Sequence, residues 1–359
     1  ANILADLDEV INGNYLPTSY DADNKGRITR WAAMAIKAKI YLFEGNWTQV
    51  KNITSTIMTE GGFKLFGSYA GLFEIANEYN SEVILDAQYR PTSREHQMMY
   101  AFLPPSLGGY SQLSPLQELV DSYIMLDGKT IKETGTSFDE SHPYANRDPR
   151  LKATVMYTGN SYTLADGTEV VINCEKGEGK DGYGVGSDCS ATGYYIKKYW
   201  DNTYRATLYS GLNPILIRYA DILLMNAEAL AELGELDKTA WDATIKPIRA
   251  RAGFTLASAV EFPEGASKDK LIEIVRNERR SELALEGHRH KDIIRWRIAD
   301  KVLNGWCHGL KTNENEVVGT DNGYVRVENR AFNANKHYLW PIPQAERDLN
   351  ANLVQNPNW

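Results

Sequence analysis

Helical patterns that end in a glycine, with a second helical pattern just beyond, recur along the chain. Before Gly45, the residues Trp31, Ala35, Ala38 and Leu42 recur at three- and four-residue steps, the spacing of one apolar helix face. Glycine ends helices because it takes the left-handed backbone conformation without strain. The breaks are FEG at 43–45, ELG at 232–234 and LEG at 285–287. The chain is therefore expected to contain helical hairpins.

These hairpins predict a scaffold that longer segments interrupt. Small residues where helices cross, a glycine between the helices and an aromatic residue in the second helix are tetratricopeptide-like features. Because the units are not tandem, we predict a mostly α, tetratricopeptide-like helix-hairpin scaffold with an insert, and not a regular solenoid. Trp31, Trp47 and Trp241 fit the helical spacing and are predicted core residues. The expected helices span 27–45, 47–57, 215–233, 237–252 (with a new start or kink at Pro247), 271–286 and 292–302.

The segment between the hairpins differs in its sequence pattern and composition. Short strand patterns, at 82–85, 151–157, 169–173 and 194–199, are separated by connections rich in Pro, Gly, Ser and Asn. Long loops in a compact domain are usually functional or disordered, so a binding surface is expected here. We thus predict a single unit, 1–359, in which 1–60 and 214–310 form the scaffold, 61–213 is a loop-rich insert with a few short β-strands, and 311–359 packs on the scaffold.

Composition excludes several classes of protein. A hydrophobic fraction of 43% with 24% charged residues is ample for a buried core. The net charge of −8 argues against a nucleic-acid binder, which normally carries a basic patch. No stretch reaches the roughly 18 apolar residues that a membrane-spanning helix needs.

Motifs for cofactors and metals have simpler explanations here. The GEGKDG string at 177–182 fits a dinucleotide-binding pattern, but YGVG follows it and cannot begin the required helix. His288 and His290 stand two residues apart beside Asp292, a spacing that points them away from each other on a helix. We therefore expect no metal and no cofactor.

The carboxylates Glu278, Glu282 and Glu286 line one helix face and could suggest the acid pair of a glycoside hydrolase. Arginines interleave with them at positions 276, 279, 280 and 289. Such a mixture usually forms a structural salt-bridge lattice. We therefore predict a structural role for this helix and no enzyme activity.

Aromatic residues are the stronger signal, with 21 Tyr and 8 Trp beside 9 Phe. Tyrosine and tryptophan rings stack on the C–H face of a sugar, while neighbouring polar groups bind its hydroxyls. Many aromatic residues will be ordinary packing residues, but the insert holds several next to polar partners. The candidate stacking residues are Trp200, Tyr204, Tyr183 and Tyr144, and the candidate hydroxyl partners are Asp181, Asn202 and Arg205.

Two of the three cysteines, Cys174 and Cys189, bracket a glycine-rich loop that a disulfide would constrain. The alternative is that all three remain unpaired thiols, and the spacing leaves both open.

Many short strings, in order along the whole chain, resemble the SusD/RagB family, the surface glycan-binding lipoproteins of Bacteroidetes nutrient-uptake systems. Individually they are modest, but together they are specific. They are GRIT at 26–29, AKIYLFEGNW at 38–47, LQELVDSY at 116–123, DGK at 127–129, RDPRL at 147–151, GYYIKKY at 193–199, RYADILL at 218–224, AEAL at 227–230, IRARAG at 248–253, ERRSELALEGHR at 278–289, LWPIP at 339–343 and QNPNW at 355–359.

The resemblance implies a non-catalytic protein that captures an oligo- or polysaccharide and hands it to a TonB-dependent, SusC-like outer-membrane transporter. It also implies a cell-surface location through a lipid anchor on an N-terminal portion that this sequence lacks. The family's binding loops vary with the glycan, so the resemblance transfers no ligand residue and leaves the sugar open. A glycoside hydrolase using a carboxylate pair and a helical-repeat, protein-binding adaptor are the alternatives.

Overall fold

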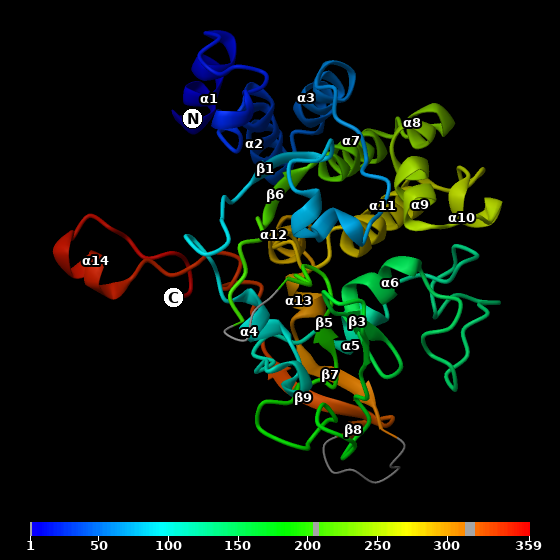
Figure 1. Cartoon of the computed structure of the whole chain (residues 1–359). Helices are drawn as coiled ribbons and strands as arrows, with labels where there is room; N and C mark the ends of the chain where they lie inside the picture. The colour runs from blue at the N-terminus through cyan, green and yellow to red at the C-terminus, as the bar shows by residue number, and fades with distance from the viewer. Residues whose placement is uncertain (1, 204–207, 313–319) are drawn as a thin grey trace.

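The computed structural model describes residues 2–203, 208–312 and 320–359. The scaffold helices are α1 (Asn2–Asn12), α2 (Arg30–Glu44), α3 (Trp47–Glu60), α7 (Tyr219–Leu233), α8 (Lys238–Ala243), α9 (Ile245–Ala252), α10 (Ala257–Val260), α11 (Lys268–Glu282), α12 (Arg289–Arg295) and α13 (Ala299–Val302). In Figure 1 most scaffold helices lie in the upper part, α12 and α13 lie near the middle, and the insert and a C-terminal sheet lie in the lower part.

Local sequence explains where these helices begin and end. The Thr29 side chain accepts a hydrogen bond from the Ala32 N–H and caps α2. Gly45 and Gly234 take left-handed φ angles of 73° and 74° and end α2 and α7. The predicted pairs α2–α3 and α7 with α8–α9 therefore form, and α7 is buried between them. Trp241 is fully buried in the same core.

Four predicted helices differ clearly in their bounds. Residues 215–218 form strand β6 (Ile215–Arg218), which pairs antiparallel with β1 (Val83–Asp86) before α7 begins. The 237–252 segment breaks at Thr244 instead of at Pro247, which sits in the first turn of α9 where its missing N–H costs nothing. The 292–302 segment divides into α12 and α13, with a left-handed Arg297 between them. Helix α11 ends at Glu282, four residues before the predicted end.

The insert consists of short elements around its own core of tyrosine and aliphatic side chains, including Tyr123, Tyr162 and Tyr195. The 151–157 strand prediction was wrong in its first half. A helix forms there instead: Asp148 caps it, Pro149 is its first residue and Thr154 its last. The strand comprises only the next two residues. The elements are α4 (Met98–Phe102), α5 (Gln117–Val120), α6 (Pro149–Thr154), β2 (Val155–Met156), β3 (Ser161–Thr163), β4 (Glu169–Val171) and β5 (Tyr195–Ile196), with β2 paired to β5 and β3 to β4.

The C-terminal segment contains a sheet that the sequence patterns did not predict. Strands β7 (Gly305–Lys311), β9 (Tyr324–Arg330) and β8 (Thr320–Asp321) lie side by side in that order. Tyr338 then contacts the scaffold, its hydroxyl donating to Asp300 at 2.7 Å. Beyond it, the segment with α14 (Gln344–Leu349) extends away from the rest of the chain (Figure 1).

A buried ion-pair lattice joins the insert to the scaffold. Arg150, on α6 of the insert, donates to Glu278 at 2.6 Å and to Glu282 at 2.9 Å, both on α11. Arg218, at the end of β6, contacts Glu282 at 2.6 Å and Glu286 at 2.7 Å. Other side chains complete the lattice, namely Glu82, Asp148, Lys198, Arg249 and Arg251.

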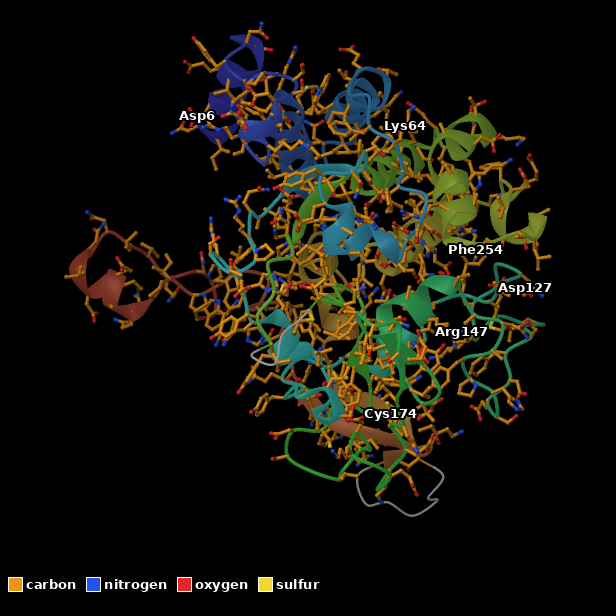
Figure 2. All side chains as sticks on the ribbon, viewed as in Figure 1. Asp6, Lys64, Asp127, Arg147, Cys174 and Phe254 are labelled. Carbon is orange, nitrogen blue, oxygen red and sulfur yellow. The ribbon has the colours of Figure 1, made fainter. Side chains whose placement is uncertain are left out.

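The prediction of a structural lattice along α11 therefore fits these contacts, but its cations come mainly from other elements. Opposite charges buried from both sides hold the two halves in one geometry. A further buried arginine, Arg147 (labelled in Figure 2), donates to the carbonyls of Val120 and Tyr123 inside the insert.

Candidate functional site

The predicted stacking residues that the structure describes are engaged in packing. Trp200 donates its indole N–H to the Thr163 carbonyl at 2.8 Å, and its ring lies 5.0 Å from that of Tyr162. Tyr144 stacks on Tyr157 with ring centres 4.0 Å apart, and its hydroxyl lies 3.2 Å from that of Tyr194. Burial raises the pKa of Tyr144.

The remaining predicted residues fall into three groups. Tyr183 packs against the insert core, and the buried Asp181 accepts the Ser106 N–H at 2.8 Å. Asn202 is exposed. Tyr204 and Arg205 lie outside the described residues. The role of these side chains in sugar binding stays a prediction.

The possible disulfide between Cys174 and Cys189 is not formed. All three cysteines are free thiols, and the Cys189 thiol donates to the Lys180 carbonyl at 3.2 Å. Cys174 is buried in the insert (Figure 2), and burial raises its pKa. The glycine-rich loop at 177–182 begins no helix, as predicted. Its closure comes from backbone hydrogen bonds, such as the Gly177 N–H to Tyr183 carbonyl bond at 3.0 Å.

The carboxylates of α11 are poorly suited to acid catalysis. Burial opposes ionisation, but the guanidiniums of the lattice outweigh it and lower the pKa of Glu278, Glu282 and Glu286, the last to about 2. A glycosidase general acid needs a raised pKa. Burial also lowers the pKa of His288, to about 4. Within the ranges that the structure describes, no group of three His, Cys, Asp or Glu side chains could hold a metal ion.

An open hollow in the insert presents a different set of side chains. Its volume is about 490 Å³, and tyrosine rings and guanidiniums lie together in its wall. Tyr79 is 40% exposed, and its hydroxyl donates to Gln88 at 2.6 Å. The residues lining this hollow, which we call the Tyr79 hollow, are Glu78, Tyr79, Gln88, Tyr89, Arg90, Pro91, Ser93 and Arg94.

Asn213 holds the two sides of the Tyr79 hollow together. Its side-chain oxygen accepts the Tyr89 N–H at 2.6 Å, and its amide nitrogen donates to the Tyr79 hydroxyl at 3.3 Å and to Asp86 at 3.2 Å. The Asn213 N–H in turn donates to Glu78 at 2.7 Å. These contacts hold the Tyr79 hydroxyl and the Tyr89 backbone in place.

The charges in the Tyr79 hollow favour a polar ligand. The Arg94 guanidinium lies 5.4 Å from the Tyr89 ring centre, and His96 packs edge-on against the same ring at 4.6 Å. Among the described residues, no carboxylate lies within 4.0 Å of the Arg90 or Arg94 guanidinium. Burial raises the pKa of Glu78, despite its hydrogen bond from Asn213.

Ser210, eight residues after the predicted Asn202, pairs with His96, whose ring packs against Tyr89 of this hollow. Backbone hydrogen bonds pair His96 with Ser210 in both directions, at 2.9 and 3.0 Å. The residues that line this hollow lie within 61–213, where the sequence predicted a binding surface, but Tyr79 and Tyr89 were not among its candidate residues. The available signal was two tyrosines within a Glu-, Gln- and Arg-bearing stretch between residues 78 and 94.

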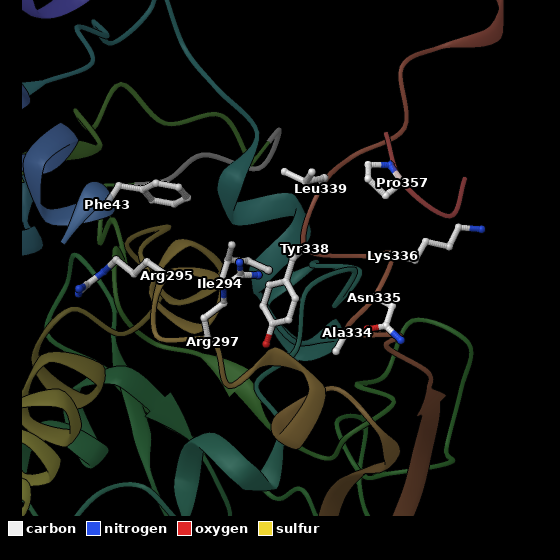
Figure 3. A pocket seen from close by; sticks show the side chains of 10 residues that line it. All are labelled: Phe43, Ile294, Arg295, Arg297, Ala334, Asn335, Lys336, Tyr338, Leu339 and Pro357. Atoms are coloured by element: carbon white, nitrogen blue, oxygen red, sulfur yellow. The ribbon is translucent and has the colours of Figure 1, made fainter. Parts of the chain in front are cut away.

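A second hollow, of about 420 Å³, lies between the scaffold and the C-terminal segment. Figure 3 shows Phe43 on one side and Tyr338, Leu339 and Pro357 on the other. Phe43 and Leu339 are each 54% exposed, and the Arg297 guanidinium lies 4.4 Å from the Tyr338 ring centre. This hollow is largely apolar and lacks the network of polar groups found around Tyr79.

The chain thus combines a helical scaffold with a loop-rich half that contains a hollow of aromatic and polar side chains. The sequence model of the SusD family matches residues 72–359, and the chain belongs to this family. Both the predicted family and the predicted mostly helical fold are thereby confirmed.

Curated relatives include the SusD-like protein P25 of Formosa agariphila, which is 28% identical over 95% of this chain and 60% of its own length. A SusD-like protein of Bacteroides ovatus is 25% identical over 79% of this chain and 49% of its own length. The chain thus spans about half to three-fifths of these relatives.

Solved structures show the same fold. A SusD-like carbohydrate binding protein from Bacteroides fragilis has a TM-score of 0.85 and 29% identity, over 98% of this chain and 70% of that chain. Surface glycan-binding protein A from Bacteroides thetaiotaomicron has a TM-score of 0.61 and 20% identity, over 99% and 69%, and supports the fold alone. In the described part of the chain, no helix has the length and apolar character to cross a membrane.

Proposed function

We propose that the chain binds an oligo- or polysaccharide at the cell surface without turning it over. The observation that carries this proposal is the Tyr79 hollow, where an exposed, hydrogen-bonded tyrosine faces the same space as Arg90 and Arg94. The chain's membership of the SusD family and its similarity to a SusD-like carbohydrate binding protein from Bacteroides fragilis support the same proposal.

Each part of the Tyr79 hollow has a role in this proposal. The rings of Tyr79 and Tyr89 offer apolar faces for the C–H groups of a sugar. Gln88, Glu78 and the two guanidiniums supply donors and acceptors for hydroxyl groups. Because Asn213 and Gln88 hold the Tyr79 hydroxyl, little entropy of that side chain is lost when a sugar binds.

In our proposal the exposed Asn202 also contacts the sugar. Tyr204 and Arg205, which lie outside the described residues, remain candidates from the sequence. In this proposal the packing of the insert core depends on four other predicted residues, namely Trp200, Tyr183, Tyr144 and Asp181. We further propose that the chain passes its glycan to a TonB-dependent, SusC-like transporter and is held at the outer membrane by a lipid anchor. Family membership supports these last two points.

The test begins with electrophoresis through gels that contain different polysaccharides, with chromatography of the same mixtures to detect cleaved products. Retardation without products is expected. A protein-binding adaptor would be retarded by no polysaccharide, and a hydrolase would release products.

Isothermal titration with a retarding glycan then locates the site. Tyr79→Ala and Tyr89→Ala should each weaken binding by roughly three- to tenfold, because each removes one stacking ring. Tyr15→Ala is the matched control, since Tyr15 is 67% exposed and lies outside the hollow. Trp200→Ala tests the candidates predicted from the sequence: we expect unchanged affinity if the sugar binds in the Tyr79 hollow and weaker binding if it stacks on Trp200. Unchanged affinity in both Tyr79→Ala and Tyr89→Ala would refute this location.

A further inference from the structure

A third cavity, separate from the two hollows described above, lies where α5, the α11–α12 turn and β7 meet. Its volume is about 550 Å³. Leucine and alanine side chains form much of its wall, and the indole of Trp306, 43% exposed, belongs to the same wall. Four guanidiniums also line it. Those of Arg279 and Arg330 pair with carboxylates, and among the described residues those of Arg280 and Arg289 do not. We call it the Arg280 cavity.

The carboxylates that line the Arg280 cavity are already paired with other groups. Glu118 binds the ring of His308 at 2.7 Å and leaves only its backbone carbonyl for the Arg280 guanidinium. Asp292 accepts from Arg279 at 3.0 Å and from Arg295 at 2.9 Å. Neither carboxylate is therefore available to neutralise the two cavity arginines.

Arg280 and Arg289 consequently stand without ion pairs. Across residues 2–203, 208–312 and 320–359, no carboxylate oxygen lies within 4.0 Å of either guanidinium. Burial, together with the neighbouring charge of Arg289, lowers the pKa of Arg280 to about 10. Burial also lowers the pKa of Arg289, although Asp292 opposes this.

The pKa of the adjacent Arg279 is shifted in the opposite direction. Burial acts on it too, but Asp292 and Asp221 outweigh burial and raise its pKa. A partly desolvated cation without a counter-ion is unfavourable, so an anion that enters the cavity would offset much of the cost of desolvation. Two guanidiniums beside an indole match a ring that carries a negative group.

We propose that the Arg280 cavity binds an anionic sugar residue, whose carboxylate or sulfate group pairs with Arg280 and Arg289 while its ring packs against Trp306. This inference rests on the proposed function and narrows it to acidic glycans. Carboxylate and sulfate share the chemistry that guanidinium groups recognise, and the two arms of the experiment separate them.

The experiment compares sugars that differ only in charge. In one arm, calorimetric titration compares tri-galacturonic acid with its neutral methyl ester; in the other, a sulfated carrageenan tetrasaccharide is compared with its desulfated form. We expect at least one acidic form to bind about tenfold or more tightly than its neutral counterpart, because a charge-assisted pair is lost with the charge.

Variants then assign that preference to the cavity. Arg280→Gln and Arg289→Gln should each remove most of the preference for the acidic form, and Trp306→Ala should weaken binding of both forms. Lys291→Gln is the matched control, because Lys291 is an exposed cation on α12 outside the cavity. Melting temperatures should stay level or rise in Arg280→Gln, since an unpaired, partly buried charge is removed.

The outcomes separate this inference from the proposed function. Equal binding of acidic and neutral forms in both arms, or a charge preference that survives both arginine variants, would overturn the inference. A neutral glycan whose binding depends on Tyr79 would still support the proposed function. Absence of binding to every carbohydrate in the panel would overturn both. A lower melting temperature in Arg280→Gln with an intact charge preference would identify a structural arginine and overturn the inference.

Discussion

Replacing Arg150 with methionine should cost about 3–5 kcal/mol of unfolding free energy, the usual cost of breaking a buried ion pair from one side. Arg150 is 1% exposed and binds three carboxylates, with distances of 2.7 Å to Asp148, 2.6 Å to Glu278 and 2.9 Å to Glu282. After its removal, Glu278 keeps Arg249 and Glu282 keeps other arginines. Asp148 keeps no cation among the ion pairs of the described residues.

The second substitution, Asp148→Asn, identifies the cause. Asparagine preserves the helix cap that Asp148 provides to the N–H of residue 150, but it carries no charge. In the Arg150→Met background it should recover about 1 kcal/mol or more of the loss. Alone, it should be mildly destabilising, because Arg150 retains two carboxylates.

Urea unfolding followed by circular dichroism measures all four members of this cycle. If Arg150 acts only by filling space, Asp148→Asn will add to the damage in the double variant. Additive losses would therefore refute the charge argument and leave packing as the explanation.

Two further predictions concern the C-terminal sheet and the thiols. Burial lowers the pKa of His308, but hydrogen bonds to Asp321 and Glu118 outweigh burial and raise it above 6.5. The stabilisation is therefore complete below pH 6.5 and is lost as the pH rises through the folded value, so the melting temperature should fall over that range and His308→Gln should flatten the fall. A slope unchanged in His308→Gln would contradict the assignment. In the native protein, iodoacetamide should label Cys189 before the buried Cys174, and mass spectrometry should find both thiols reduced; a mass lower by two hydrogens would show a disulfide.

The helices were predictable because their signals are local. Thr29 and Gly45 sit at the two ends of α2, and each acts through its own backbone or the next turn. Strand β6 was not predictable in this way. Its Ile-Leu-Ile run fits a buried helix as well as a strand, and pairing with β1, more than a hundred residues earlier in the chain, decides between them.

The C-terminal sheet was missed for a related reason. Strand β7 contains two glycines and a histidine, which is a weak strand pattern. Its position depends on β9 and on the contact between His308 and Glu118 of α5, which lies 190 positions earlier in the sequence. Long-range contacts of this kind leave no periodic trace in the segment itself.

The candidate site was predicted as a region but not as residues. Composition indicated that tyrosine and tryptophan in the insert could bind a sugar. It could not separate Trp200, which packs on Tyr162, from Tyr79, which faces solvent with a left-handed φ of 58°. That difference depends on Asn213, which approaches Tyr79 only after the chain has folded.

The charged helix α11 differs from its sequence-based interpretation in where its charges find partners. Interleaved Glu and Arg residues indicated pairing along α11, the usual pattern of an exposed helix. The face of α11 that carries Glu278 and Glu282 is instead buried, and these glutamates pair with Arg150, Arg218 and other cations from outside the helix. Two of the interleaved arginines, Arg280 and Arg289, are left without carboxylates. Because Glu278 and Glu282 pair with cations from other elements, Arg280 and Arg289 line the cavity without a carboxylate partner in the described part of the chain, and in our proposal they bind the acidic group of a ligand there.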